Sequence, residues 1–321
     1  MSRMLLAAVL AAGAALAPCL AGAQSWPQRS VKFVLPLGPG AGADITARLL
    51  ADRLTRQWGQ PVVVENRPGG DAVVAINAVL SARDDHVLLY APTGAFAAHP
   101  YTLDKVPYDA RELLPVARVS NTVVALAVPA SLNVQSLREL VSRARAEPGK
   151  LNWTAVTGVY DIVISAYLKQ AGLDLVKVSY KDPVAALNDL VEGRIHLYSA
   201  AYVIVRAQAQ AGRLRVLAIE NRTRAPGLDI PTAAEAGYPE LQLDGLVGVL
   251  AARSSGISDA VRERIAADVR AQLADPQIAE RMTATGQIVN PGSPAEFAAA
   301  IEEQNAQMAA HGRALGLGAK P

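Results

Sequence analysis

The sequence PLGPGAGAD at residues 36–44 joins an apolar run at residues 31–36 to an amphipathic segment at residues 44–58. The run predicts a buried strand, and the segment, which stops at Gly59, predicts a helix. Small residues let a ligand approach the backbone, and a helix start offers unpaired N–H groups with partial positive charge. We therefore expect an anion site without a basic side chain, in which Asp44 caps the helix. Its candidate residues are Gly38, Pro39, Gly40, Ala41, Gly42 and Asp44.

Other interpretations of this stretch stay open. The turn could bind no ligand. A nucleotide phosphate loop would need Gly-Lys-Ser/Thr, and the stretch contains no lysine. Residues 38–43 match the dinucleotide pattern G-x-G-x-x-A, and Glu65 ends the next predicted strand. Pro39 stiffens that turn, which argues against a nicotinamide cofactor, and we expect no cofactor.

Outward from this stretch, strands and helices alternate along the chain. The predicted strands are 31–36, 61–65, 87–91, 123–128, 151–154, 173–178, 195–200, 214–219 and 247–251, and residues 101–114 are expected to be irregular. The predicted helices are 44–58, 71–83, 136–146, 159–170, 183–192, 203–211, 259–273, 276–284 and 294–311. The alternation predicts an α/β fold with parallel-rich sheets flanked by helices.

The chain has 321 residues, enough for about two domains. We expect two lobes joined by extended strands, with residues 24–124 and 246–321 in lobe 1 and residues 125–245 in lobe 2. In open α/β sheets, ligands bind at the carboxyl ends of strands. The loops that follow the strands should therefore line a cleft between the lobes.

Several later strand ends carry hydroxyl groups and small residues. Each is by itself more often an ordinary turn, but their shared position at strand ends favours a cleft that suits a carboxylate ligand. The candidates are Thr93, Gly94 and Ala95 after the third strand, and Thr154, Thr157, Gly158, Tyr180 and Ser199 in the second lobe.

The N-terminus has the order of a secretory signal. Arg3 is followed by apolar or small residues at 4–16 and by the small-residue pattern Ala-Gly-Ala at 21–23. A membrane anchor is less favoured because the run is short, and a lipoprotein would place a small residue where Pro18 precedes Cys19. We expect cleavage after Ala23, loss of the only cysteine, and a periplasmic mature protein.

Composition and motifs disfavour several function classes. Of the residues, 51% are hydrophobic and 19% charged, and the net charge is +2, so a nucleic-acid partner is not expected. The four histidines, His86, His99, His196 and His311, do not have metal-ligand spacing, and we expect surface or turn positions for them. No nucleophile elbow or other catalytic motif occurs, so neither a catalytic residue nor a metal is predicted.

Motifs in a consistent order resemble one known family. The opening at residues 34–48 and the sequence VVENRPG at 63–69 are similar to the substrate-binding proteins of tripartite tricarboxylate transporters, the Bug-type receptors. Further matches are PYD at 107–109, GKLN at 149–152, VSYK at 178–181, ALNDL at 186–190, GRLR at 212–215 and PTAAEAG at 231–237.

This resemblance implies a two-lobed periplasmic binding protein of type II. It also implies that residues 38–44 and 93–95 grip a carboxylate through backbone groups and water, with residues 154–158 facing them. The implied partners are a small organic acid and the membrane permease subunits of the transporter, and the implied receptor is a monomer without catalysis. An exported sensor module remains an alternative, and an exported enzyme acting on a carboxylate would need a base that no motif supplies.

The chain departs from the family pattern at several positions. Residues 83–88 read RDDHVL where the family usually has PDGYTL, and Asp182 replaces a usual glycine. Ser199 stands where the family often has an aspartate. The far side of the expected pocket therefore does not match the family pattern, so the identity of the acid stays open, and an amine-bearing ligand that needs the aspartate is not expected.

Overall fold

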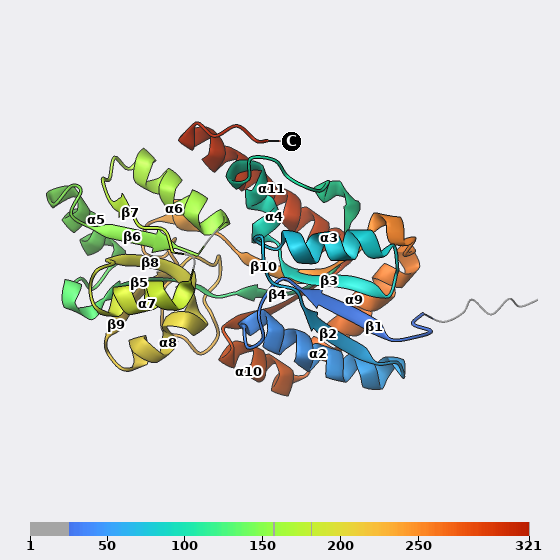
Figure 1. Ribbon diagram of the computed structural model, residues 1–321. Helices are drawn as coiled ribbons and strands as arrows, with labels where there is room; N and C mark the ends of the chain where they lie inside the picture. The colour runs from blue at the N-terminus through green and yellow to red at the C-terminus, as the bar shows by residue number, and fades with distance from the viewer. Residues whose placement is uncertain (1–25, 157, 181, 321) are drawn as a thin grey trace, which may run out of the picture.

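The computed structural model describes residues 26–156, 158–180 and 182–320 and builds them around two β-sheets (Figure 1). The predicted signal sequence at residues 1–23 and the candidate Thr157 lie outside the described residues. In the described part of the chain, no helix is both long and apolar enough to cross a membrane.

The first sheet has six strands. Their order is β11 (Gln287–Gly292), β4 (Leu113–Thr122), β10 (Gly245–Ala252), β3 (Val87–Pro92), β1 (Val31–Leu35) and β2 (Val62–Asn66). One face packs against α2 (Gly42–Trp58), α9 (Asp259–Leu273) and α10 (Pro276–Ala284). The other face packs against α3 (Val73–Ala82), α4 (Gly94–Thr102) and the first turns of α11 (Pro294–Leu315).

The second sheet has five strands. Their order is β7 (Val176–Lys177), β6 (Asn152–Ala155), β8 (Leu197–Ala201), β5 (Val124–Pro129) and β9 (Leu214–Ile219). The helices α5 (Leu137–Ala146) and α6 (Val159–Gln170) bury one face, and α7 (Pro183–Val191) and α8 (Tyr202–Gln210) bury the other. Short 3₁₀ turns occupy Ala110–Glu112, Ala130–Leu132, Pro239–Leu241 and Arg253–Ser255.

Both sheets are mixed, which corrects the expectation of parallel-rich sheets. The pairs β1–β2, β1–β3, β6–β7 and β6–β8 are parallel, whereas β10 pairs with β3 and β4, β11 with β4, and β5 with β8 and β9 in antiparallel fashion. The strands β4 and β11 were not predicted. Polar residues such as Arg118 and Asn121 interrupt β4, and β11 ends in Asn-Pro-Gly, so neither has the apolar pattern of a buried strand.

The chain passes from the first sheet to the second between β4 and β5 and returns between β9 and β10. The fully buried Asn221 joins the two passages. Its side-chain oxygen accepts a hydrogen bond from the Val124 N–H at 3.0 Å, and its amide donates to the Thr122 carbonyl at 2.9 Å. Asn221 therefore links the segment that follows β9 to the connection between β4 and β5.

The last helix contacts both halves of the molecule. Phe297 in its first turn belongs to the core of the first-sheet half, and Met308, about three turns later, belongs to the core around α5 and α6. Figure 1 shows α11 extending past α4 toward α6. The C-terminal helices thus do not all pack on the first-sheet half alone.

Candidate functional site

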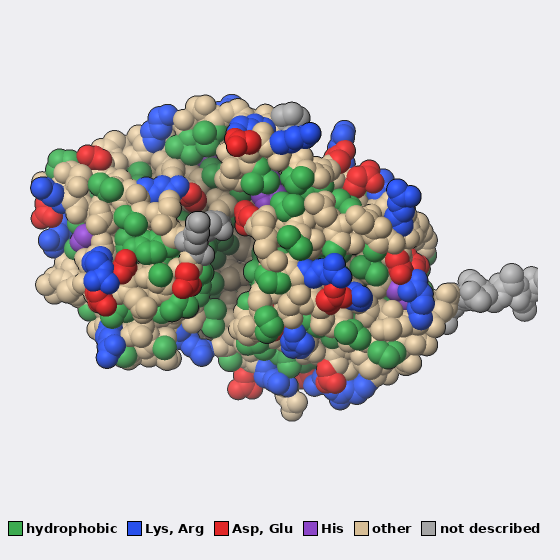
Figure 2. Space-filling view, viewed as in Figure 1, with side chains coloured by type: hydrophobic (Ala, Val, Ile, Leu, Met, Phe, Trp, Pro, Cys, Tyr) green, Lys and Arg blue, Asp and Glu red, His purple; other side chains and the backbone are tan. Residues whose placement is uncertain are grey.

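A cavity of about 440 Å³ lies between the two sheets. Figure 2 shows the surface hollowed between the two halves of the molecule. Its volume is in the range typical of small-molecule sites. Residues 36, 37, 41–43, 69, 71, 72, 92, 94, 95, 245, 246, 287 and 304 form what we call the first-sheet wall, and residues 124, 156, 159, 160, 183, 201, 203 and 204 form the second-sheet wall, with Thr122 between them.

The first turns of two helices of the first-sheet half, α2 and α4, line this cavity. Ala41, Gly42 and Ala43 at the start of α2 and Gly94 and Ala95 at the start of α4 belong to its lining. Neither helix has a side-chain cap, so the first-turn N–H groups keep their hydrogen-bonding capacity. Their partial positive charges suit a carboxylate.

Missing caps distinguish the helices at the cavity from most others. The helices α2, α3, α4, α6 and α8 begin at lining residues, and none has a side-chain cap. In contrast, α5, α9, α10 and α11 begin elsewhere and are capped by Ser136, Ser258, Asp275 and Ser293. The helix α7 is the intermediate case, since Pro183 lines the cavity and Asp182 caps the helix. Free helix starts are therefore concentrated where a ligand can use them.

Asp44 is not the N-cap of α2, which corrects the expectation. It stabilises the glycine-rich turn by hydrogen bonding instead. It is the third helical residue, is buried, and its carboxylate accepts hydrogen bonds from the Gly40 N–H at 2.9 Å and from Arg48 and Asn66. Burial opposes the charged form, yet these hydrogen bonds hold the pKa of Asp44 below its usual value. Gly38, Pro39 and Gly40 are not among the cavity-lining residues. Of the candidate residues predicted in this stretch, Ala41 and Gly42 line the cavity, and Asp44 positions the turn.

Position 42 needs a glycine because another segment of the chain packs closely against it. A Cβ at this position would lie 2.7 Å from the Thr285 carbonyl oxygen and 3.2 Å from Nε2 of Gln287. The turn between α10 and β11 therefore packs directly on the start of α2. Because Gln287 also lines the cavity, the same approach brings a side-chain amide next to the free N–H groups.

Thr93 supports the site without lining it. Its side chain is fully buried, and its hydroxyl donates a hydrogen bond of 2.6 Å to Oε1 of Gln304. Nε2 of Gln304 in turn donates to the Asp244 carbonyl at 3.1 Å. The Thr93 hydroxyl, expected to bind the ligand, instead binds Gln304 of α11, whereas the neighbouring Gly94 and Ala95 line the cavity.

The hydroxyls predicted on the opposite side do not line the cavity. Thr154 and Ser199 are buried, and the Ser199 hydroxyl donates to Oε1 of Glu220 at 2.5 Å. The Tyr180 hydroxyl donates to Asp189 at 2.5 Å. Gly158 lies at the start of α6 with φ +83°, where a Cβ would lie 3.5 Å from that of Ala98, so it marks a contact between the halves.

Sequence reasoning missed the polar side chains that line the cavity, and Asp71, in the segment before α3, is one of them. Thr122, Tyr160, Gln287 and Gln304 line it, and they come from β4, α6, β11 and α11. Tyr160 lies at the first turn of α6, where burial raises the pKa of its hydroxyl, which therefore stays protonated. The signal that could have pointed to α6 is its lack of a Ser, Thr, Asp or Asn cap, since Gly158 precedes it.

Glu220 is a buried acid beside the crossing between the sheets. It is fully buried, and burial raises its pKa to about 8, partly opposed by the hydrogen bond from Ser199. Its second oxygen has no partner in the described part of the chain. Glu220 is therefore largely protonated at neutral pH and adds no negative charge to the second-sheet half.

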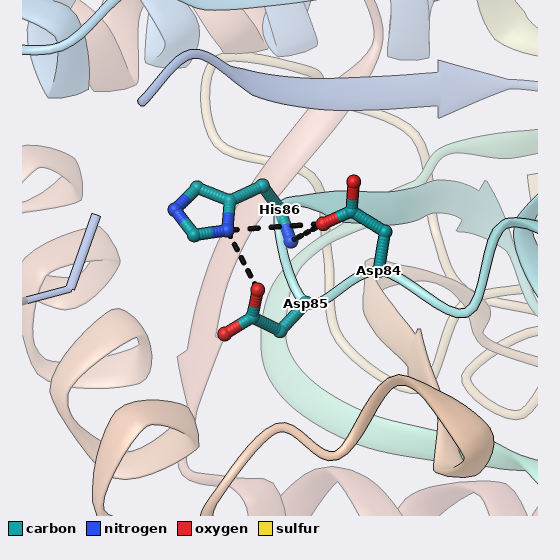
Figure 3. A group of neighbouring side chains, drawn as sticks. All are labelled: Asp84, Asp85 and His86. Atoms are coloured by element: carbon teal, nitrogen blue, oxygen red, sulfur yellow. Dashed lines mark hydrogen bonds and ion pairs between the residues drawn. The ribbon is translucent and has the colours of Figure 1, made fainter. Parts of the chain in front are cut away.

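Asp84, Asp85 and His86 form a cluster (Figure 3) and are not among the residues that line the cavity. Nδ1 of His86 lies 2.6 Å from Asp85, its Nε2 accepts from the Gln28 N–H, and Asp84 is paired with Arg29. These contacts tie down the segment before β1. His86 lies in the turn before β3, as expected, although its side chain is buried. His99 is buried within α4, which corrects the expectation of a surface or turn position for it.

A family model described as the tripartite tricarboxylate transporter family receptor matches residues 46–317. The chain belongs to this family. A UPF0065 protein of Bordetella bronchiseptica is 32% identical to this receptor over 307 residues, covering 95% of this chain and 90% of the relative. The receptor is thus similar to that protein over nearly its full length.

Solved structures agree with this assignment. Rpa4515 of R. palustris, determined with adipate, has a TM-score of 0.80 and 28% identity to the receptor, covering 91% of this chain and 99% of that chain. MatC of Rhodopseudomonas palustris with bound malate has a TM-score of 0.75 and 25% identity, covering 89% and 99%. These similarities confirm the expected α/β binding-protein architecture, and the protein is a solute-binding receptor of its family.

Proposed function

We propose that this receptor is exported to the periplasm after cleavage at Ala23 and captures a small carboxylate-bearing molecule for a tripartite tricarboxylate-type transporter. The uncapped starts of α2 and α4 at one cavity carry the proposal. Adipate in Rpa4515 and malate in MatC support a carboxylate as the ligand class. The membrane permease subunits of the transporter would receive the ligand.

The carboxylate would bind to the backbone N–H groups of Gly42 and Ala43 on one side and of Gly94 and Ala95 on the other. Side-chain amides of Gln287 and Gln304 lie in the same wall and can donate further hydrogen bonds. Helix dipoles and neutral donors suffice for this task, because a helix N-terminus carries partial positive charge. Asp44 and Thr93 would act behind this wall as positioning residues.

We further propose that the receptor is a monomer that closes two lobes, residues 24–124 with 246–321 and residues 125–245, without catalysing a reaction. The placement of β4 and β5 in different sheets supports this division. Asp71 and Tyr160 are the ionisable side chains among the described lining residues, and no histidine, lysine or cysteine lines the cavity with them.

The test is ligand-dependent stabilisation of the mature protein. Ligand carried over from expression is removed by unfolding and refolding, and melting temperatures are then measured with a broad panel of small carboxylates. A ligand that binds the folded state raises the melting temperature in proportion to the logarithm of its concentration. Absence of a shift with every acid of the panel would refute carboxylate capture.

A further inference from the structure

The two walls of the cavity differ in chemistry. The first-sheet wall combines the helix starts of α2 and α4 and the amide side chains of Gln287 and Gln304 with the Asp71 carboxylate and several apolar side chains. The second-sheet wall consists of apolar side chains and one tyrosine. Its members are Val124, Val156, Val159, Tyr160, Pro183, Ala201, Val203 and Ile204.

Many backbone donors of the second-sheet half near the cavity are already committed. The N–H groups of Val124 and Val156 donate to the Asn221 side chain and the Ser199 carbonyl, and that of Tyr202 donates to the Val123 carbonyl. The start of α8 is covered from the other half, since a Cβ at Gly286 would lie 3.5 Å from the Val203 nitrogen. The uncapped start of α6 remains on this side among the described residues, and it packs against the start of α4, since a Cβ at Gly94 would lie 2.9 Å from Cγ2 of Val159. The first-sheet wall has two helix starts and two side-chain amides and is therefore the richer in donors.

The hydroxyl groups of Ser199 and Tyr180, which could add donors to the second-sheet wall, are hydrogen-bonded to other residues. Ser199 is bonded to Glu220, and Tyr180 is bonded to Asp189. A Cβ at Gly245 would lie 2.8 Å from the Tyr160 hydroxyl, so this hydroxyl lies beside β10 at the border of the two walls. The remaining surface of the second-sheet wall is methyl and methylene groups.

We propose that the ligand is a monocarboxylic acid with an apolar body, whose carboxylate binds the first-sheet wall and whose body packs on the second-sheet wall. The inference rests on the proposed function and names the substrate class of the same site. A second carboxylate would lose its water against aliphatic side chains without a cationic partner among the described lining residues. Apolar groups instead gain from burial there.

The experiment compares matched pairs of acids on protein freed of carried-over ligand. Hexanoate and adipate have the same number of carbons and differ in the second carboxylate, and shorter, longer and aromatic pairs extend the series. Dissociation constants from calorimetry are expected to favour the monocarboxylate of the best-fitting pair by about tenfold or more, equivalent to about 1.4 kcal/mol.

The outcomes separate this inference from the proposed function. Equal or tighter binding of the dicarboxylates would overturn the inference and leave carboxylate capture standing. Failure of both series to bind would overturn carboxylate capture, and the inference would fall with it.

A variant of the second-sheet wall should shift the preference toward the dicarboxylate and so tests the same inference in the opposite direction. Ile204→Arg places a cation on the second-sheet wall, where it can pair with a second carboxylate, so adipate should gain on hexanoate by about tenfold. Val176→Arg adds the same charge on the exposed strand β7, away from the lining residues, and should leave the ratio unchanged. An unchanged ratio in a folded Ile204→Arg protein would contradict the assignment of this wall to the ligand body.

Discussion

The Thr93 hydroxyl donates a hydrogen bond of 2.6 Å to Oε1 of Gln304, a residue 211 positions later in the chain. Both side chains are buried, and Gln304 also donates to the Asp244 carbonyl. The last helix thereby holds the start of α4 and the segment that returns from the second sheet. The geometry of the cavity depends on this junction.

The variant Gln304→Leu tests the junction. It leaves the buried Thr93 hydroxyl and the Asp244 carbonyl without this partner, which should cost about 1–3 kcal/mol of unfolding free energy. Urea unfolding measures the loss. Gln307→Leu, one turn along the same helix, is the matched control and should change stability by about 0.5 kcal/mol or less. Equal losses in the two variants would contradict the role of the junction.

A cap introduced at the cavity should separate stability from binding. Ala41→Asp places a carboxylate at the N-cap of α2, where it can accept from the first-turn N–H groups and should stabilise the protein by about 1 kcal/mol. The same carboxylate would occupy the site of a ligand carboxylate, so calorimetry should detect no acid binding.

The control for this cap is Ser258→Ala at the start of α9, away from the cavity lining. It removes a cap and should lower stability by about 1 kcal/mol with affinity unchanged. Retained ligand affinity in Ala41→Asp would show that the start of α2 does not hold the acid.

Two glycines of the same turn should respond differently to alanine. In Gly42→Ala the new methyl group meets the Thr285 carbonyl oxygen at 2.7 Å, and relief of this contact should cost about 1–3 kcal/mol. Gly38→Ala meets no atom within 4 Å and should stay within about 0.5 kcal/mol of the unaltered protein. Thermal unfolding of both variants checks the contrast, and a neutral Gly42→Ala would show that α2 does not pack on this turn.

Glu220 should make stability fall as the pH rises. Burial raises its pKa to about 8 in the folded protein, above the value of about 4.3 expected in the unfolded chain. The folded state therefore binds more protons between these values. Its contribution is largest below the unfolded pKa and declines toward pH 8, by at most about 1.4 kcal/mol per pH unit.

Unfolding of Glu220→Gln between pH 5 and 8 measures this contribution. The isosteric amide does not titrate, so the variant should lose less stability with rising pH than the unaltered protein. Glu302→Gln on an exposed turn of α11 is the control and should keep the original pH profile. Parallel profiles for the Glu220→Gln and unaltered proteins would show that Glu220 does not carry the dependence.

Local signals predicted most elements well. The stretch at residues 36–44 contains the turn that opens α2, and the ends of α9 and α10 agree with the helices predicted from periodicity and caps. The last helix begins with a capping box, in which Ser293 and Glu296 each accept from the other's backbone N–H. Such features depend on neighbours within one or two turns, which the sequence displays directly.

Long-range packing decided the remainder. A strand such as β4, with Arg118 and Asn121, forms because β10 and β11 supply hydrogen bonds on both sides, and no local pattern announces those partners. The direction of a hydroxyl is decided in the same way: Thr93 and Ser199 turn to Gln304 and Glu220 rather than to the cavity.

The sequence by itself thus determined the family, the alternation of elements and the helix start that can hold an anion. Only the tertiary structure decided which residues share the cavity, and that the starts of α2 and α4 and two side-chain amides lie in one wall while the other has apolar side chains and one tyrosine. The physical reason is that a free N–H group or a methyl group is a local property, whereas its exposure to a common space depends on residues hundreds of positions apart.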